Sequence, residues 1–248
     1  MRLGALLGPI VNGSKHRTLA DQAVNFARSG YSSLWSAQAI GRGFMITDPL
    51  QALTVAATVA PDVEVGTAVL QLPLYHPMEL AHRIYSLQQI AGGRLLLGVG
   101  AGSTEADFAA YERDYEARFK TFYAHLDRLR EIFADSQNAL SPWPAVAQGP
   151  DLLFGTWGKK VEEAAHRFDG WIASGHYRTP DEVCAALARY RAAGGGRAIV
   201  STLQVGADTD LGEFGAKLEQ FAQAGFDDGV VMLLPGAPDA EAVRALLP

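Results

Sequence analysis

Short apolar runs alternate along the chain with longer segments in which apolar residues recur every three or four positions. The runs are typical of buried parallel strands, and the longer segments are typical of amphipathic helices. The apolar start of the chain is interpreted as a first strand and not as a signal peptide. The predicted strands are 3–7, 33–37, 63–70, 94–99, 152–156, 170–174, 198–205 and 229–234. The predicted helices are 18–28, 49–59, 77–91, 119–134, 161–167, 180–193, 211–224 and 239–247.

This alternation indicates the fold class. Strictly alternating units imply parallel strands that are joined by right-handed crossovers. The length of 248 residues is close to the ~250 residues that are typical of one barrel of this kind. We therefore expect an α/β fold, a (β/α)8 TIM barrel with eight parallel strands, as a single domain over residues 1–248. An open doubly wound sheet stays as the alternative, because periodicity alone does not show closure.

Composition and charge narrow the classes of partner. The formal net charge is −6 and the lysines and arginines are scattered, so no basic stripe is present to bind nucleic acid or anionic lipid. No uninterrupted apolar run reaches the ~18 residues that suggest a membrane span. The single cysteine, Cys184, favours a reducing, cytoplasmic location. We expect a small-molecule substrate, and the oligomeric state stays open between monomer and homodimer.

In a barrel of this type, function is carried by the carboxyl ends of the strands and the loops that follow them. This rule singles out a set of positions for attention. They are Asn12, His16, Gln38, Gln71, Tyr75, His76, Gly100, Gly102, Ser103, Thr156, Trp157, Gly158, His176, Tyr177 and Gln204. None of the six histidines has the spacing of a metal-binding pair, and no nucleophile motif is present, so we expect neither a metal nor a hydrolytic site.

Two glycine-containing segments follow predicted strands. The run Gly98–Gly102 lacks the spacing of a dinucleotide-binding motif, so its small residues indicate either close packing or room for a flat ring. The segment Phe154–Lys160, F-G-T-W-G-K-K, places Gly155 and Thr156 before a predicted helix start, with two lysines beside them. Free backbone N–H groups at a helix start suit a phosphate, and an ordinary turn with solvated lysines is the alternative.

Several segments together resemble one known family. They are S-G-Y-S-S-L-W at 29–35, V-G-T-A-V-L-Q-L-P-L-Y-H-P at 65–77, L-Q-Q-I-A-G-G-R-L-L-L-G-V-G-A-G at 87–102 and A-A-H-R-F-D-G-W-I-A-S-G at 164–175. Their order and spacing resemble the luciferase-like flavin and deazaflavin oxidoreductases. The resemblance covers most of residues 1–175, and the remainder fits by architecture alone.

The resemblance implies a cofactor and its site. It implies that the barrel holds coenzyme F-420, a deazaflavin, or FMN, with a cis peptide between Ala68 and Val69 behind the ring. The cofactor-binding residues are then Gln38, Ala68, Val69, Gly100, Gly155, Thr156, Trp157 and Gly158. Relatives often carry an acidic residue and a histidine where this chain has Gln38 and Ala39, and this departure favours F-420.

The predicted activity is hydride transfer from reduced F-420 to a small organic substrate. The catalytic candidates are His76 and His176, because histidine exchanges a proton near neutral pH. Each has a simpler explanation, as a helix-start residue and as a solvated loop residue respectively. The alternatives are an FMN-dependent monooxygenase, a non-catalytic flavin-binding barrel and an unrelated phosphate-binding isomerase. We expect Trp35 and Trp171 to lie in the core and not at the cofactor.

Overall fold

The strands form a closed ring of parallel strands. The structure, a computed structural model, describes residues 1–10 and 15–247. The strand segments are β1 Arg2–Leu6, β2 Ser33–Ser36, β3 Glu64–Thr67, β4 Leu70–Gln71, β5 Leu95–Gly100, β6 Asp151–Gly155, β7 Gly170–Ser174, β8 Arg197–Val205 and β9 Asp228–Leu233. Both β3 and β4 pair with β5, so they share one position in the ring. The ring therefore has eight strand positions, which confirms the predicted (β/α)8 TIM barrel and excludes the open sheet.

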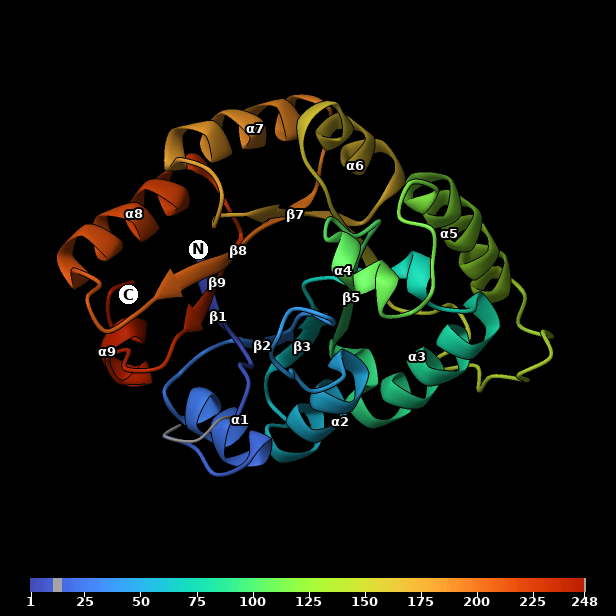
Figure 1. Cartoon of the computed structure of the whole chain (residues 1–248), viewed down its shortest axis with the longest axis horizontal. Coiled ribbons are helices and arrows are strands. Elements are labelled where there is room, and N and C mark those ends of the chain that lie inside the picture. The colour runs from blue at the N-terminus through green and yellow to red at the C-terminus, as the bar shows by residue number, and fades with distance from the viewer. Residues whose placement is uncertain (11–14, 248) are drawn as a thin grey trace.

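The helices form an outer ring around the strands (Figure 1). They are α1 Leu19–Arg28, α2 Pro49–Val59, α3 Pro77–Ala91, α4 Glu105–Ala109, α5 Arg118–Ala134, α6 Val161–Arg167, α7 Pro180–Ala192, α8 Leu211–Ala224 and α9 Ala240–Arg244. Short 3-10 helices occupy Leu72–Leu74, Gly92–Arg94 and Gly158–Lys160. Helix α4 lies inside the outer ring in the view of Figure 1. Across residues 1–10 and 15–247, no helix combines the length and apolar character needed to cross a bilayer.

Most predicted elements agree with the structure to within one or two residues. The predicted third strand is wrong in one respect, because residues 63–70 are divided into β3 and β4. The segment 101–118 contains α4, which no pattern predicted because five residues are too few to show a helical period. The last helix is also shorter than predicted and ends at Arg244.

Local sequence signals explain several of the helix boundaries. The Thr18 hydroxyl accepts a hydrogen bond from the Asp21 N–H, and the Asp21 carboxylate accepts one from the Thr18 N–H, so α1 begins with a capping box. Asp48 caps α2 as predicted, with Pro49 in its first turn. Strand β5 begins one residue later than predicted. Arg94 instead donates hydrogen bonds to the carbonyl oxygens of Ala57, Ala60 and Val63, at the end of α2 and in the turn after it.

The barrel has an outer and an inner apolar layer. Strand residues that point outward, such as Trp171, pack against the helices. Residues that point inward form a separate cluster, which consists of Leu6, Trp35, Leu96, Leu153, Ile172, Ile199 and Val230. Trp35 crosses the lumen beside Gly66, where a Cβ would lie 2.5 Å from its ring. Trp35 and Trp171 are both fully buried, which confirms that they belong to the core.

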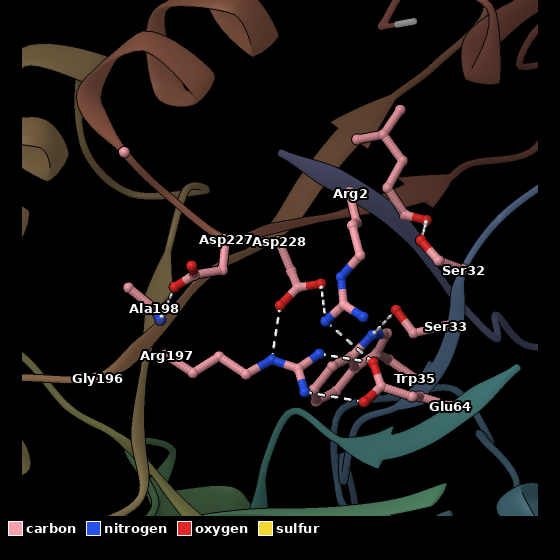
Figure 2. A network of polar contacts seen from close by, with 12 residues as sticks. Arg2, Ser32, Ser33, Trp35, Glu64, Gly196, Arg197, Ala198, Asp227 and Asp228 are labelled. Carbon is pink, nitrogen blue, oxygen red and sulfur yellow. Dashed lines mark hydrogen bonds and ion pairs between the residues drawn. The ribbon is translucent and has the colours of Figure 1, made fainter.

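An ion-pair network fills the lumen at the amino ends of the strands (Figure 2). The Arg197 guanidinium donates to both Glu64 carboxylate oxygens, at 2.9 and 2.7 Å, and its Nε donates to Asp228 Oδ2 at 2.7 Å. Arg2 pairs with the other Asp228 oxygen at 2.8 Å. Burial raises the pKa of Glu64, but Arg197 and Arg2 outweigh burial and hold that pKa below its usual range. Because charged side chains occupy the lumen at the amino ends of the strands, we expect a ligand to bind at the carboxyl ends.

Candidate active site at the carboxyl ends of the strands

The junction between β3 and β4 forms part of the barrel mouth. The peptide bond between Ala68 and Val69 is cis, as expected from the sequence resemblance. Ala68, Val69, Ala37 and Met232 are partly exposed and pack against the inner apolar cluster. These four side chains therefore form an apolar floor at the open end of the lumen, with Trp35 and Ile172 in the cluster below it.

Two glycines give the Val69 side chain its place in this floor. A Cβ on Gly155 would lie 2.5 Å from Val69 Cγ1, and a Cβ on Gly100 would lie 3.0 Å from Val69 Cγ2. Gly98 is packed more closely still, with the Thr67 carbonyl oxygen 2.0 Å from the position of its Cβ. Close packing is thus the correct interpretation of Gly98 and Gly100.

Gln38 stands in a polar network at the edge of the floor. Its side-chain oxygen accepts a hydrogen bond from the Gln71 N–H at 2.8 Å, and Gln38 is 6% exposed. The Gln71 amide in turn donates to Asp107 Oδ2 at 2.7 Å. Arg42 also donates to Asp107, with 2.9 Å from its Nε to Oδ1. Sequence reasoning did not find Asp107 or Arg42, and no motif marks them, because neither follows a strand directly.

The loop after β6 holds the predicted phosphate-binding residues. Thr156, Trp157 and Gly158 are partly exposed, and the 3-10 turn that begins at Gly158 leads into α6 at Val161. Lys160 does not face this loop, since its ammonium group donates to the Tyr123 hydroxyl at 2.6 Å. The predicted contribution of two lysines is therefore wrong for Lys160.

An arginine from the neighbouring loop lies closer to the predicted phosphate-binding segment. The Arg178 guanidinium stacks over the Trp157 ring, 3.9 Å from its centroid. Trp157 itself stacks on the buried Trp171, whose indole N–H donates to the Thr156 carbonyl oxygen at 3.0 Å. A guanidinium over an aromatic ring still has N–H groups that can donate to an anion. Sequence reasoning missed Arg178 because it directly follows none of the predicted strands.

Comparison with known proteins identifies the family. The model of the luciferase-like monooxygenases matches residues 4–227.

The chain belongs to the luciferase-like monooxygenase family.

Individual relatives match it less completely. The 4-hydroxyprotoasukamycin monooxygenase of Streptomyces nodosus subsp. asukaensis is 38% identical over 79 residues, which are 32% of this chain and 21% of that protein. The chain thus covers well under two thirds of this curated relative.

Two solved structures share the fold at low sequence identity. The oxygenating constituent of 3,6-diketocamphane monooxygenase from Pseudomonas putida, in complex with FMN, has a TM-score of 0.68 and 18% identity. The match covers 100% of this chain and 83% of that one. An F420-dependent secondary alcohol dehydrogenase in complex with an F420-acetone adduct has a TM-score of 0.76 and 14% identity, over 100% and 98% of the two chains. At these identities the likeness shows the fold alone.

The two catalytic candidates of this luciferase-like chain lie at the surface. His76 is exposed at the residue before α3, and its side chain does not cap the helix. His176 is exposed in the loop after β7, where its ring packs edge-on against Tyr177 with 4.3 Å between centroids. Both are on the face that carries the apolar floor, but the structure shows no contact between them. Asn12, also singled out from the sequence, lies outside the described residues.

Proposed function

We propose that this luciferase-like chain is an oxidoreductase that binds a flavin-type ring on the floor formed by Ala37, Ala68, Val69 and Met232. The floor is the observation that carries the proposal. It is apolar, partly exposed and continuous with the buried cluster inside the barrel. A flat ring on it would cover these side chains and exclude water from them. The ring would supply the redox chemistry, and the protein would bind and orient it.

The loop after β6 suits the phosphate-bearing tail of FMN or F-420. Thr156, Trp157 and Gly158 would contact the tail, and Arg178 would supply the positive charge that Lys160 does not. Because its guanidinium carbon lies over the Trp157 ring, Arg178 is attracted to that ring as a cation while its N–H groups remain donors for an anion. Gly100 and Gly155 act one step further from the ring, by allowing Val69 to sit where it does.

Monooxygenation with reduced FMN has more support than the reaction predicted first from the sequence. The matching family is described as luciferase-like monooxygenase, and a curated relative is named as a monooxygenase. Hydride transfer from reduced F-420 to a small organic substrate is the second candidate. Gln38 favours this second reaction. Its buried amide oxygen already accepts a hydrogen bond from the Gln71 N–H, and an amide cannot donate a proton to a reaction intermediate as an acid would. In either reaction His176 is our first candidate for proton donor, with His76 second.

Binding measurements test the proposal directly. The purified chain is titrated with FMN, riboflavin and F-420, and ligand fluorescence is followed at low salt. We expect micromolar or tighter binding of one phosphate-bearing cofactor. For FMN, Arg178→Gln should weaken binding about tenfold, the usual effect of losing one charged hydrogen bond, and should leave riboflavin affinity unchanged. Riboflavin is the matched control because it has the same ring and no phosphate.

Three results would count against this function. If neither FMN nor F-420 binds at tens of micromolar, a flavin-type cofactor is excluded and the isomerase alternative returns. If Arg178→Gln weakens FMN and riboflavin equally, Arg178 supports the ring or the fold and not the phosphate. The third result is cofactor binding without any catalysis. If neither the protein nor an added organic acceptor changes the rate at which the reduced cofactor is oxidised, a non-catalytic flavin-binding barrel is the better description.

A further inference from the structure

Asp107 is a buried carboxylate that the proposed chemistry does not use. It lies in the five-residue helix α4 and its side chain is fully buried. Four donors surround it: Nε and Nη2 of Arg42, Nε2 of Gln71 and the backbone N–H of Ile40. The Ile40 N–H lies 3.1 Å from Oδ1. Burial raises the pKa of Asp107, but the hydrogen bonds from Arg42, Gln71 and Ile40 outweigh burial and hold that pKa below its usual range.

These contacts join three segments that are far apart in the sequence. Ile40 and Arg42 belong to the loop after β2, residues 37–48, which we call the β2 loop. Gln71 ends β4, and Asp107 belongs to the segment after β5. The β2 loop also packs directly on α4, because a Cβ on Gly41 would lie 2.5 Å from the Ala106 carbonyl oxygen. The Asp107 carboxylate therefore joins the β2 loop to the end of β4 and to α4.

The β2 loop begins at the carboxyl end of β2 with the floor residue Ala37. Strands β2 and β7 are four positions apart in the eight-position ring, so they face each other across the lumen. The pKa of Arg42 is raised, first by its hydrogen bond to Asp107 and to a smaller extent by Tyr177, which lies in the loop after β7. The contacts that fix Arg42 are its two hydrogen bonds to Asp107.

We propose that Asp107 is a positioning residue, which holds the β2 loop against α4 at the barrel mouth by binding Arg42 and the Ile40 N–H. The consequence of this inference rests on the proposed function, because a β2 loop held in this position would shield one edge of a flavin-type ring on the apolar floor from solvent. Asp107 itself touches neither the floor residues nor a reacting group. Its effect passes through Arg42, Ile40 and Gln71.

Asp107→Asn is the variant that changes the charge and keeps the shape. An ionised Asp107 only accepts hydrogen bonds, so Gln71 must present its NH2 to it, and Gln71 Oε1 is left buried with no partner. With asparagine, the Gln71 amide can turn over and accept from the new NH2 group. We therefore expect the fold to survive while Arg42 loses its ion pair.

Hydrogen exchange of the protein without cofactor is the deciding measurement. We expect the Ile40 amide, whose N–H donates to Asp107, to exchange about tenfold faster in Asp107→Asn, as for the loss of one charged hydrogen bond. The matched control is Asp228→Asn, which removes an equally buried, arginine-paired carboxylate at the other end of the barrel. It should leave exchange in the β2 loop unchanged. Equal exchange in wild type and Asp107→Asn, or the same acceleration in Asp228→Asn, would overturn the proposal.

Arg42 gives a second route that does not depend on replacing a buried residue. Arg42→Gln should also release the β2 loop, and Arg42→Lys, which keeps the charge, should restore part of the protection. Once a cofactor is bound, iodide should quench its fluorescence more strongly in Asp107→Asn than in Asp228→Asn. Failure of the unaltered chain to bind any cofactor would overturn the proposed function alone, because the exchange comparison is made without one. If Arg42→Gln leaves the exchange of the β2 loop unchanged, the positioning role is wrong.

Discussion

Gly155→Ala tests the packing beneath the proposed cofactor site. The added methyl group would lie 2.5 Å from Val69 Cγ1, well inside van der Waals contact. Val69 cannot turn away easily, because β-branching restricts its χ1 and its other methyl already faces Gly100. Overpacking of this kind costs about 1–3 kcal/mol. We expect the free energy of unfolding to fall by that amount. We also expect weaker FMN binding, since Val69 would be displaced towards the ring.

Urea unfolding followed by circular dichroism measures the stability change, with an unchanged m-value as the check that both states are comparable. Gly93→Ala is the control, because its added methyl meets no atom within 4 Å. Val69→Ala removes the methyl groups that clash, so the double variant Gly155→Ala/Val69→Ala should recover about 1 kcal/mol or more relative to additivity. Additive single effects, or a Gly155→Ala protein as stable as the parent, would show that Val69 does not fill this space.

The same geometry changes how a more obvious variant should be interpreted. Gly155→Asp, which the sequence alone suggests as a way to repel a bound phosphate, would introduce the same steric conflict with Val69. Weaker cofactor binding by that variant would therefore say little about the phosphate. Arg178→Gln with riboflavin as control avoids this ambiguity, because the contact of Arg178 is with the partly exposed Trp157.

Three further predictions concern stability. Hydrogen bonds hold the pKa values of Glu64, Asp107 and Asp227 in the folded protein below their usual range. These carboxylates therefore stabilise the fold at pH values above about 4, the pKa of such groups in the unfolded chain, and this stabilisation is lost as the pH falls through their pKa values in the folded protein. Urea midpoints should thus be level above pH ~5 and fall on further acidification, and a rise between pH ~5 and ~3 would contradict this. Trp35→Phe should lower the free energy of unfolding by about 1–3 kcal/mol, because it removes the donor to Ser33 Oγ and leaves a void beside Gly66. A smaller loss, measured by thermal unfolding, would mean that the lumen repacks. Thr179→Ala should cost about 1 kcal/mol by removing the capping box of α7, whereas Thr58→Ala, on the exposed side of α2, should cost much less in the same assay.

The sequence by itself determined the fold class and the position of most elements. Alternating strand and helix patterns are local, and so are the capping signals at Thr18 and Asp48, so each can be recognised without knowing what it packs against. The resemblance to the luciferase-like family added the cis peptide at Ala68–Val69, which the structure contains. It also added a prediction of where a cofactor would bind. These predictions needed only short stretches of sequence in a fixed order.

Only the tertiary structure decided which side chains surround the mouth and what each one does. Arg42 and Asp107 are 65 residues apart, and no local pattern connects them. The β2 loop and α4 come together because β2 and β5 both pair with β3. Pairing of neighbouring strands likewise places Val69 near Gly100 and Gly155, and it brings Arg178 onto Trp157. Contacts of this kind depend on the three-dimensional arrangement of distant strands, so periodicity and spacing along one chain do not contain them.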